Sequence, residues 1–341
     1  MNIKIVSFTR DGALFSLKLC KLLDNRGFDA TGYYKEDMPG LVKRTGDILK
    51  FAESAFESCD ALIFVGAAGI AVRAVAPYLR GKDIDPAVLV CDEKGRYVIP
   101  ILSGHLGGAN RLAEEIAEQI GAAAVLTTAT DINGKFAADV WARDNNCRVF
   151  DPPKIKAVSS AILAGEPVGF LSDFPVDGAY PKGVFPVGYG KIGILVSLDV
   201  SRNPFAHTLH LVPQCIAIGI GCKRGVTHEN VEEQFLQTLA AGNVPVKAVN
   251  CVASINLKAK EAALLALCEK YCLPFQTFSA QELAGVQGEF TDSDFVRRTT
   301  GVGNVCERAA VKASGGTLII RKTAGKSVTT AAAKADWKGQ F

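Results

Sequence analysis

The 341-residue sequence has neither a long apolar run nor a strong charge imbalance. No segment supplies the about 20 apolar residues that a membrane-spanning helix needs, and residues 1–17 lack the basic-then-apolar order of a signal peptide. We therefore expect a cytoplasmic protein with no membrane partner. Lys and Arg number 38 and Asp and Glu 35, a net charge of +3, which disfavours a nucleic-acid partner. A small anionic ligand is more consistent with this balance.

Histidine is scarce, and no two cysteines have the C-x-x-C spacing. Of the four histidines, His207 and His210 stand three apart, but no further metal ligands follow them closely, so a protein-built zinc site is disfavoured. The ten cysteines are spread through a long chain, many within apolar stretches. This distribution predicts reduced, buried thiols and no protein-held metal.

Two glycine-rich segments lack the remaining features of nucleotide-binding motifs. Residues 219–225 (GIGCKRG) have Arg224 where the dinucleotide fingerprint needs its third glycine, and no carboxylate ends the next strand. Residues 324–327 (AGKS) have Ile320 where a Walker motif needs its first glycine. The sequence thus predicts neither a nicotinamide cofactor nor a bound nucleoside triphosphate.

Apolar segments typical of buried strands alternate with helical patterns in the first part of the chain and again after residue 214. This order predicts an α/β protein with two three-layer α/β domains, whose mostly parallel sheets are covered by helices. A smaller mixed middle segment, rich in proline and glycine, is expected to join them through short strands, turns and a helix near residues 155–163. The predicted parts are an N-terminal domain (1–142), a middle segment (143–213) and a C-terminal domain (214–341).

A glycine-rich loop with one histidine joins a strand to an amphipathic helix at residues 101–117 (ILSGHLGGANRLAEEIA). Gly107 and Gly108 precede the helix, so we expect their N–H groups to stabilise an oxyanion beside His105. The loop residues expected to assist or to contact the ligand are Ser103, Asn110 and Arg111.

Residues 127–134 (TTATDING) follow the last clear strand of the first domain. We expect this segment to share a sheet edge with residues 66–69 and 103–108, which would bring Asp131 to His105. A carboxylate there would orient the imidazole for proton transfer. The alternative is that both are ordinary polar residues of turns.

Positive side chains accompany three further glycine turns. Each turn suits a carboxylate or phosphate, and together they imply a ligand with several carboxylates. The alternative for each is a tight turn with solvated cations. The candidate ligand-binding residues are Gly69 and Arg73, then Gly221, Lys223 and Arg224, and finally Arg297 and Arg298.

Five segments follow one another along the chain: GAAGIAVRAVAP, DPAVLVCDEKGRYVIPILSGHLGGANRLAEEIA, TTATD followed by DVWA, GIGCKRG and TGVGNVCERAAVKASGGTLIIRK. Taken in this order, they resemble the cobalt-precorrin-5A hydrolases of anaerobic cobalamin biosynthesis. The similarity spans roughly residues 60–142 and 215–332. At two positions the sequence departs from the expected pattern, with Lys223 in place of an arginine and Arg308 in place of a proline.

The resemblance implies opening of the ring A δ-lactone of a cobalt-bearing tetrapyrrole and release of a two-carbon unit as acetaldehyde. Such a substrate carries many carboxylates, in agreement with the cationic turns, and it brings its own cobalt, so no intrinsic cofactor is expected. We expect His105 to act as the general base and Asp131 to orient it or act as a second acid or base.

Two alternatives have different functions. One is a non-catalytic corrinoid-binding carrier of the same pathway, and the other is a hydrolase or sugar-acid enzyme that acts on a smaller anion. Transient hand-off to other enzymes of the pathway and formation of a homodimer are left open by the sequence.

Overall fold

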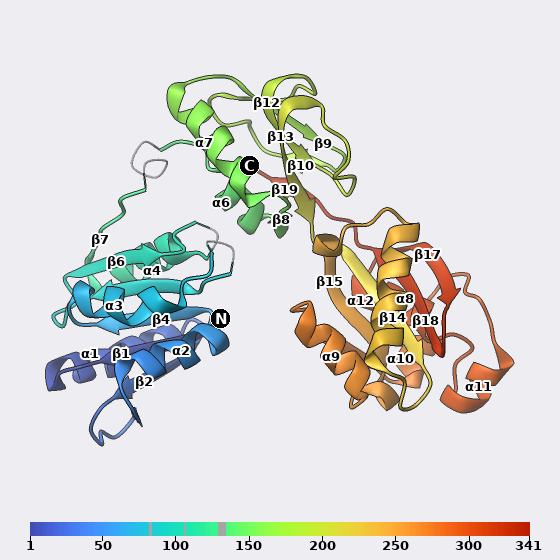
Figure 1. Cartoon of the computed structure of the whole chain (residues 1–341), viewed down its shortest axis with the longest axis horizontal. Helices are drawn as coiled ribbons and strands as arrows, with labels where there is room; N and C mark the ends of the chain where they lie inside the picture. Colours follow the sequence, from blue (N-terminus) through green and yellow to red (C-terminus); the bar gives the residue numbers. More distant parts are fainter. Residues whose placement is uncertain (82–83, 106, 129–133) are drawn as a thin grey trace. The chain divides into compact units, whose positions relative to one another are not determined.

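The computed structural model describes residues 1–81, 84–105, 107–128 and 134–341, and the chain divides into two units, Met1–Val140 and Trp141–Phe341. Figure 1 shows the elements of both units, each of which combines helices with sheets, as the sequence predicts. Along the described residues, no helix combines the length and apolar character that crossing a membrane requires.

The first unit contains a seven-stranded sheet of order β3-β2-β1-β4-β5-β6-β7. All neighbouring strands run parallel except β5 and β6, which are antiparallel. The predicted mostly parallel sheet is therefore confirmed. Its strands are β1 (Asn2–Ser7), β2 (Asp29–Tyr34), β3 (Val42–Lys43), β4 (Ala61–Val65), β5 (Ala87–Cys91), β6 (Tyr97–Leu102) and β7 (Ala123–Ala124).

Helices cover both faces of this sheet. Alternate residues of β4 face opposite sides: Ile63 packs with α1 and α4, and Phe64 packs with α2 and α3. This alternation is the two-residue period of a strand that is buried on both faces, and it produces three layers. The helices are α1 (Arg10–Asp24), α2 (Ile48–Ser58), α3 (Ala68–Val75), η1 (Ala76–Tyr78), α4 (Ala109–Ile120) and α6 (Ala138–Asp144), the last of which continues into the second unit.

The middle segment forms a five-stranded sheet of its own, with order β11-β9-β12-β13-β8. Its strands are parallel except β8, which is antiparallel to β13. The predicted helix is present as α7 (Ile155–Ala164), after η2 (Pro152–Lys154), but β12 and β13 are longer than the short strands expected. The strands are β8 (Cys147–Val149), β9 (Val168–Ser172), β11 (Val184–Phe185), β12 (Gly190–Val196) and β13 (Phe205–Pro213).

The last residues of the chain pair with the middle segment. Strand β19 (Gly339–Gln340) runs parallel to β10 (Val176–Asp177). The Asn145 side chain accepts from the Gln340 N–H at 2.6 Å and donates to the Gln340 carbonyl at 3.0 Å. The Trp337 indole donates to the Asn145 carbonyl at 2.8 Å. These bonds connect the end of the C-terminal domain to the beginning of the middle sheet.

The C-terminal domain contains a second five-stranded sheet, with order β16-β15-β14-β18-β17. Strands β14, β15 and β16 are parallel, whereas β18 is antiparallel to both of its neighbours. The strands are β14 (Ile216–Cys222), β15 (Val249–Ile255), β16 (Phe275–Phe278), β17 (Thr317–Ala324) and β18 (Val328–Lys334). The helices are α8 (His228–Ala241), η3 (Val246–Ala248), η4 (Asn256–Lys258), α9 (Ala262–Lys270), α10 (Ala280–Ala284), α11 (Asp294–Thr300) and α12 (Cys306–Ser314).

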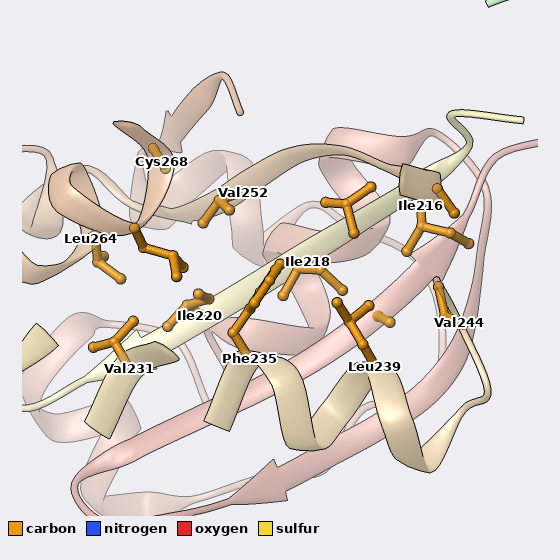
Figure 2. Packing of buried hydrophobic residues seen from close by; sticks show 14 of the residues in the cluster. Ile216, Ile218, Ile220, Val231, Phe235, Leu239, Val244, Val252, Leu264 and Cys268 are labelled. Atoms are coloured by element: carbon orange, nitrogen blue, oxygen red, sulfur yellow. The ribbon is translucent and has the colours of Figure 1, made fainter. Parts of the chain in front are cut away.

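The central strand β14 has different side chains on its two faces. Ile218 and Ile220 pack against α8 and α9, as Figure 2 shows. On the other face, a Cβ at Gly219 would lie 1.8 Å from the Cys306 carbonyl oxygen. Only glycine therefore allows α12 to pack this closely against the sheet. The ten cysteines are free thiols, most of them buried, as predicted.

Phe235 anchors α8 in this core, because its side chain is fully buried and its ring lies 5.2 Å from that of Tyr271. We expect Phe235→Ala to lower the free energy of unfolding by about 3–5 kcal/mol, since it leaves a cavity in a close-packed core. The neighbouring Leu236 is 39% exposed, and Leu236→Ala should change stability by only about 0.5 kcal/mol. Urea unfolding followed by circular dichroism measures both values; equal losses would contradict this assignment.

Candidate functional site

His105 forms a hydrogen bond with Asp139 in the first unit. His105 Nδ1 lies 3.1 Å from Asp139 Oδ2, and the two side chains are 13% and 11% exposed. His105 belongs to the loop between β6 and α4, and Asp139 to the first turn of α6. Because an ionised carboxylate only accepts hydrogen bonds, Nδ1 must carry the hydrogen. In the neutral ring, Nε2 is then the nitrogen that accepts a proton.

The surroundings of Asp139 favour its ionised form. Burial raises the pKa of this carboxyl. The hydrogen bond and the charge of His105, together with the backbone N–H groups of Asp139 and Val140, lower it by more than burial raises it, so the pKa is below the usual value. Asp139 is therefore a carboxylate at neutral pH. A carboxylate in contact with an imidazole orients the ring and stabilises the imidazolium that forms on proton uptake.

The loop that carries His105 is fixed at Ser103. This residue has a positive φ of 53°, and its hydroxyl donates to the Asp85 carbonyl at 2.9 Å. A Cβ at Gly107 would lie 2.4 Å from the Ser103 Cβ, so the loop can close only with glycine at that position. Ser103, predicted to contact the substrate, thus shapes the loop before His105.

The predicted oxyanion donors are corrected at Gly108. Its N–H donates to the His105 carbonyl at 3.0 Å, and the Asn110 N–H donates to the Gly104 carbonyl at 3.0 Å. These donors are used within the turn, because the left-handed Gly108 (φ 80°) folds the chain back on itself before α4. The donor role of Gly107 stays a prediction.

The expected proximity of the histidine loop to residues 127–134 is confirmed at their first residues. The buried Asn110 side chain donates to the Thr128 hydroxyl at 3.0 Å, and this bond links the start of α4 to the segment after β7. Asp131 lies outside the described residues, and its role stays a prediction. Sequence reasoning missed Asp139, although it begins the DVWA segment, 34 residues after His105.

The expected shared sheet edge is wrong for Gly69 and Arg73. Because β6 is antiparallel to β5, Val88 near the start of β5 pairs with Leu102 at the end of β6. The histidine loop therefore lies at the edge where β4 and β5 begin, whereas residues 66–69 follow the end of β4. Arg73 donates to the Gly69 carbonyl at 3.0 Å, near the start of its own helix α3.

Arg111 is on the exposed surface of α4. Its Nε donates to Glu115 at 2.8 Å, and its side chain is 65% exposed. This i, i+4 ion pair is a common arrangement on solvated helix faces. Its predicted contact with a substrate stays untested.

The second unit contains a cavity of about 1110 Å³ at the carboxyl ends of β14 and β15. Gly221, Lys223 and Arg224, which were predicted to bind a ligand, line it. Their binding role stays a prediction. The other charged or large apolar residues of the lining include Lys258, Lys260, Glu261, Lys322, Leu257 and Phe295.

Arg297 and Arg298 are not among the described residues that line this cavity. Arg297 forms an ion pair with Asp292 instead. Their helix, α11, contributes Phe295 and Thr299 to the lining. The predicted arginine site is therefore not part of the cavity, because α11 lines it through other side chains.

Glu307 organises one wall of the cavity. This fully buried carboxylate accepts from the Thr291 N–H at 2.6 Å, the Lys322 N–H at 2.7 Å and the Asn304 side chain at 2.8 Å. Buried carboxylates are stable only when their oxygens are satisfied in this way. Asn304 itself lines the cavity. The sequence provided no signal for this network beyond the presence of a glutamate in the VCE segment.

Arg308, at the position where a proline was expected, stabilises the end of a helix. Its Nη1 donates to the carbonyls of Leu283 and Val286, both at 3.0 Å, and its guanidinium lies 4.5 Å from the Phe290 ring centre. A cation is favourable at the carbonyl end of a helix, here α10. The departure from the expected pattern is thus a local structural contact.

In the described part of the chain, no three His, Cys, Asp or Glu side chains form a group that could hold a metal ion. The expectation that cobalt arrives with the substrate stays a prediction.

Three family profiles match successive parts of the chain. Residues 50–131 match "Cobalamin synthesis G N-terminal", residues 136–213 match "Cobalamin biosynthesis central region", and residues 216–333 match "Cobalamin synthesis G C-terminus".

Relatives cover nearly the whole length. The chain is 34% identical over 331 residues to a cobalt-precorrin-5A hydrolase of Salmonella typhimurium, with 93% of both chains covered. It is 31% identical to that of Priestia megaterium, with 85% of this chain and 82% of the relative covered. The chain is also similar to a solved homologue of cobalamin biosynthesis protein G from Sulfolobus solfataricus, with 24% identity, coverage of 98% of this chain and 97% of the homologue, and a TM-score of 0.45. The chain therefore belongs to the cobalt-precorrin-5A hydrolase family.

Proposed function

We propose that this protein is a cobalt-precorrin-5A hydrolase that opens the ring A δ-lactone of its substrate and releases a two-carbon unit as acetaldehyde. Family membership supports the substrate, and the named relatives support a hydrolase. The observation that carries the chemistry is the bond between His105 and the ionised Asp139. It supplies an oriented base, which hydrolysis requires.

In the proposed first step, His105 Nε2 takes a proton from water, and the hydroxide adds to the lactone carbonyl carbon. The ring C–O bond then breaks, which leaves a carboxylate and a hydroxyl on the carbon that bears the methyl group. Asp139 stabilises the imidazolium during this step and keeps the ring in the required orientation.

In the proposed second step, the new hydroxyl loses its proton while its carbon separates from the macrocycle. The C–O bond becomes the carbonyl of acetaldehyde, and the hydroxyl proton passes to solvent water. The electron pair of the broken C–C bond passes to the macrocycle, which takes up the proton held by the His105 imidazolium and so restores the neutral base. One water is consumed and one acetaldehyde is released. Cobalt stays with the macrocycle, and the protein needs no cofactor of its own.

The proposal is tested by anaerobic incubation with cobalt-precorrin-5A. We expect the product mass to change together with the appearance of acetaldehyde, measured as NADH consumption by alcohol dehydrogenase. A carrier protein would bind the substrate and return it unchanged. Bound but intact substrate would therefore contradict the proposed activity.

His105→Asn should reduce turnover by about 10²–10⁴, the usual contribution of a positioned acid or base, without changing corrinoid binding. The matched control is His207→Asn, because His207 is exposed on β13 in the other unit. It should behave as the unchanged protein does. Full acetaldehyde release by His105→Asn would remove this residue from the mechanism.

Asp139 is a positioning residue, so its loss should affect kcat rather than KM. We expect Asp139→Asn to lower kcat by about 10-fold or more, since carboxylates that orient metal-bound histidines contribute about 10- to 100-fold and the carboxylate of a catalytic triad more. Asp139→Glu, which retains the charge, should recover part of the loss. If Asp139→Asn lowers stability but leaves kcat per folded molecule unchanged, the pair is structural.

The pair also predicts a pH dependence of stability. The folded-state pKa of Asp139 is below its usual value, and the unfolded value is about 3.9. Ionised Asp139 therefore stabilises the fold above about pH 4, and this contribution disappears as the pH falls through the folded-state pKa. Asp139→Asn should cost about 1–3 kcal/mol at pH 5, and the difference should be smaller at pH 3, which is below the unfolded-state pKa. Urea titrations at both pH values measure it; a constant difference would argue against an ionised Asp139.

A further inference from the structure

We infer that the cavity in the second unit is a binding site for the carboxylate-bearing rim and one apolar face of a cobalt corrinoid, formed by residues of this unit alone. The identity of the ligand rests on the proposed function. The class of ligand follows from the charge, the exposed apolar surface and the size of the cavity. The lining residues and the proton-transfer pair belong to different units of the chain, so binding and chemistry should respond to different substitutions.

The cavity carries an excess of positive charge. Lys223, Arg224, Lys260 and Lys322 line it, and Glu261 is the carboxylate among its described lining residues. Glu261 is already engaged: Lys258 donates to it at 2.8 Å and the Gly225 N–H at 3.0 Å. The hydrogen bond from Lys258 keeps the pKa of Glu261 below its usual range. Its negative charge is therefore matched by Lys258, and the other four cations are available to an anionic ligand.

Lys223 and Lys322 come from different strand ends and face the same cavity. Lys223 follows β14, and Lys322 lies on β17. Among the described residues, neither side chain has an ion-pair partner within 4.0 Å. Cations that approach a cavity from separate elements suit a ligand with several separate carboxylates better than a single small anion.

Exposed apolar side chains accompany these cations. Phe295 is 73% exposed and Leu257 67% exposed, and both line the cavity above a buried wall that includes Val305. A hydrated inorganic anion would leave these side chains in water. A flat macrocycle with an acidic rim would cover the apolar groups with its face and neutralise the cations with its edge.

The volume favours a large ligand. Small-molecule sites usually measure about 300–1,000 Å³, and this cavity measures about 1110 Å³. A sugar acid would leave most of it filled with water, whereas a corrinoid is of suitable size. The Glu307 network fixes the backbone of Lys322 and the side chain of Asn304 in the wall, so little ordering is needed on binding.

The test is equilibrium dialysis of the full-length protein with two cobalt corrinoids, one with free peripheral carboxylates and one with those groups as amides. We expect the acid form to bind at least about tenfold more tightly than the amide form, because charge pairing supplies much of the affinity. Added salt should weaken only the acid form. Both measurements use the unchanged protein, so they do not depend on the folding of a variant.

Paired substitutions locate the site. Lys223→Ala with Lys322→Ala should weaken binding of the acid form by about tenfold or more, and Phe295→Ala should weaken both forms. The matched controls are Lys326→Ala, on the same β17–β18 hairpin but outside the lining, and Tyr189→Ala, which is 76% exposed in the middle segment. The controls should bind as the unchanged protein does.

Equal binding of the two corrinoids, or unchanged binding by the double lysine variant, would overturn the inference. Failure of the proposed function gives a different pattern. If corrinoid binding depends on Lys223 and Lys322 but no acetaldehyde is formed, the cavity assignment stands and the hydrolase proposal fails. If acetaldehyde forms and the lysine variants bind normally, the hydrolase proposal stands and the cavity assignment fails.

Discussion

The contact between His105 and Asp139 is the interaction on which the proposed chemistry depends. It joins the loop after β6 to the first turn of α6, and it determines which imidazole nitrogen carries hydrogen. The surrounding turn serves this geometry: the positive φ of Ser103 and the bond from Gly108 to the His105 carbonyl fold the loop tightly before α4. Gly108, one of the two glycines that suggested an oxyanion site, uses its N–H to close this turn.

In the C-terminal domain, too, a buried polar group holds backbone segments in place through hydrogen bonds. Gly219 allows α12 to approach the sheet, and the adjacent Glu307 receives hydrogen bonds from three segments around it. The N–H donors of these segments are therefore already hydrogen-bonded within the wall. Lys223 and Lys322, in contrast, line the cavity and have no ion-pair partner among the described side chains. A fixed wall with unpaired cations is well suited to bind an anion, because little entropy is lost on binding.

Much of the fold could be predicted from the sequence, because buried strands and amphipathic helices have distinct periods. The helix expected near residues 155–163 is α7, and the amphipathic helix expected after Gly108 is α4. Strand β2 has a weaker signal, since it contains Thr31 and Gly32 within a half-buried stretch. The strand expected just before residues 127–134 is short and pairs only at β7 (Ala123–Ala124).

The sequence by itself determined the α/β class, the histidine loop and the cationic turn after β14, because each depends on residues close together in the chain. Only the tertiary structure decided which of these features meet. Because β6 is antiparallel to β5, the histidine loop lies at the sheet edge opposite to Arg73, and the packing of α6 brings Asp139, 34 residues away, to His105. Strand direction and long-range contacts arise from the packing of the whole sheet, which no local pattern of residues encodes.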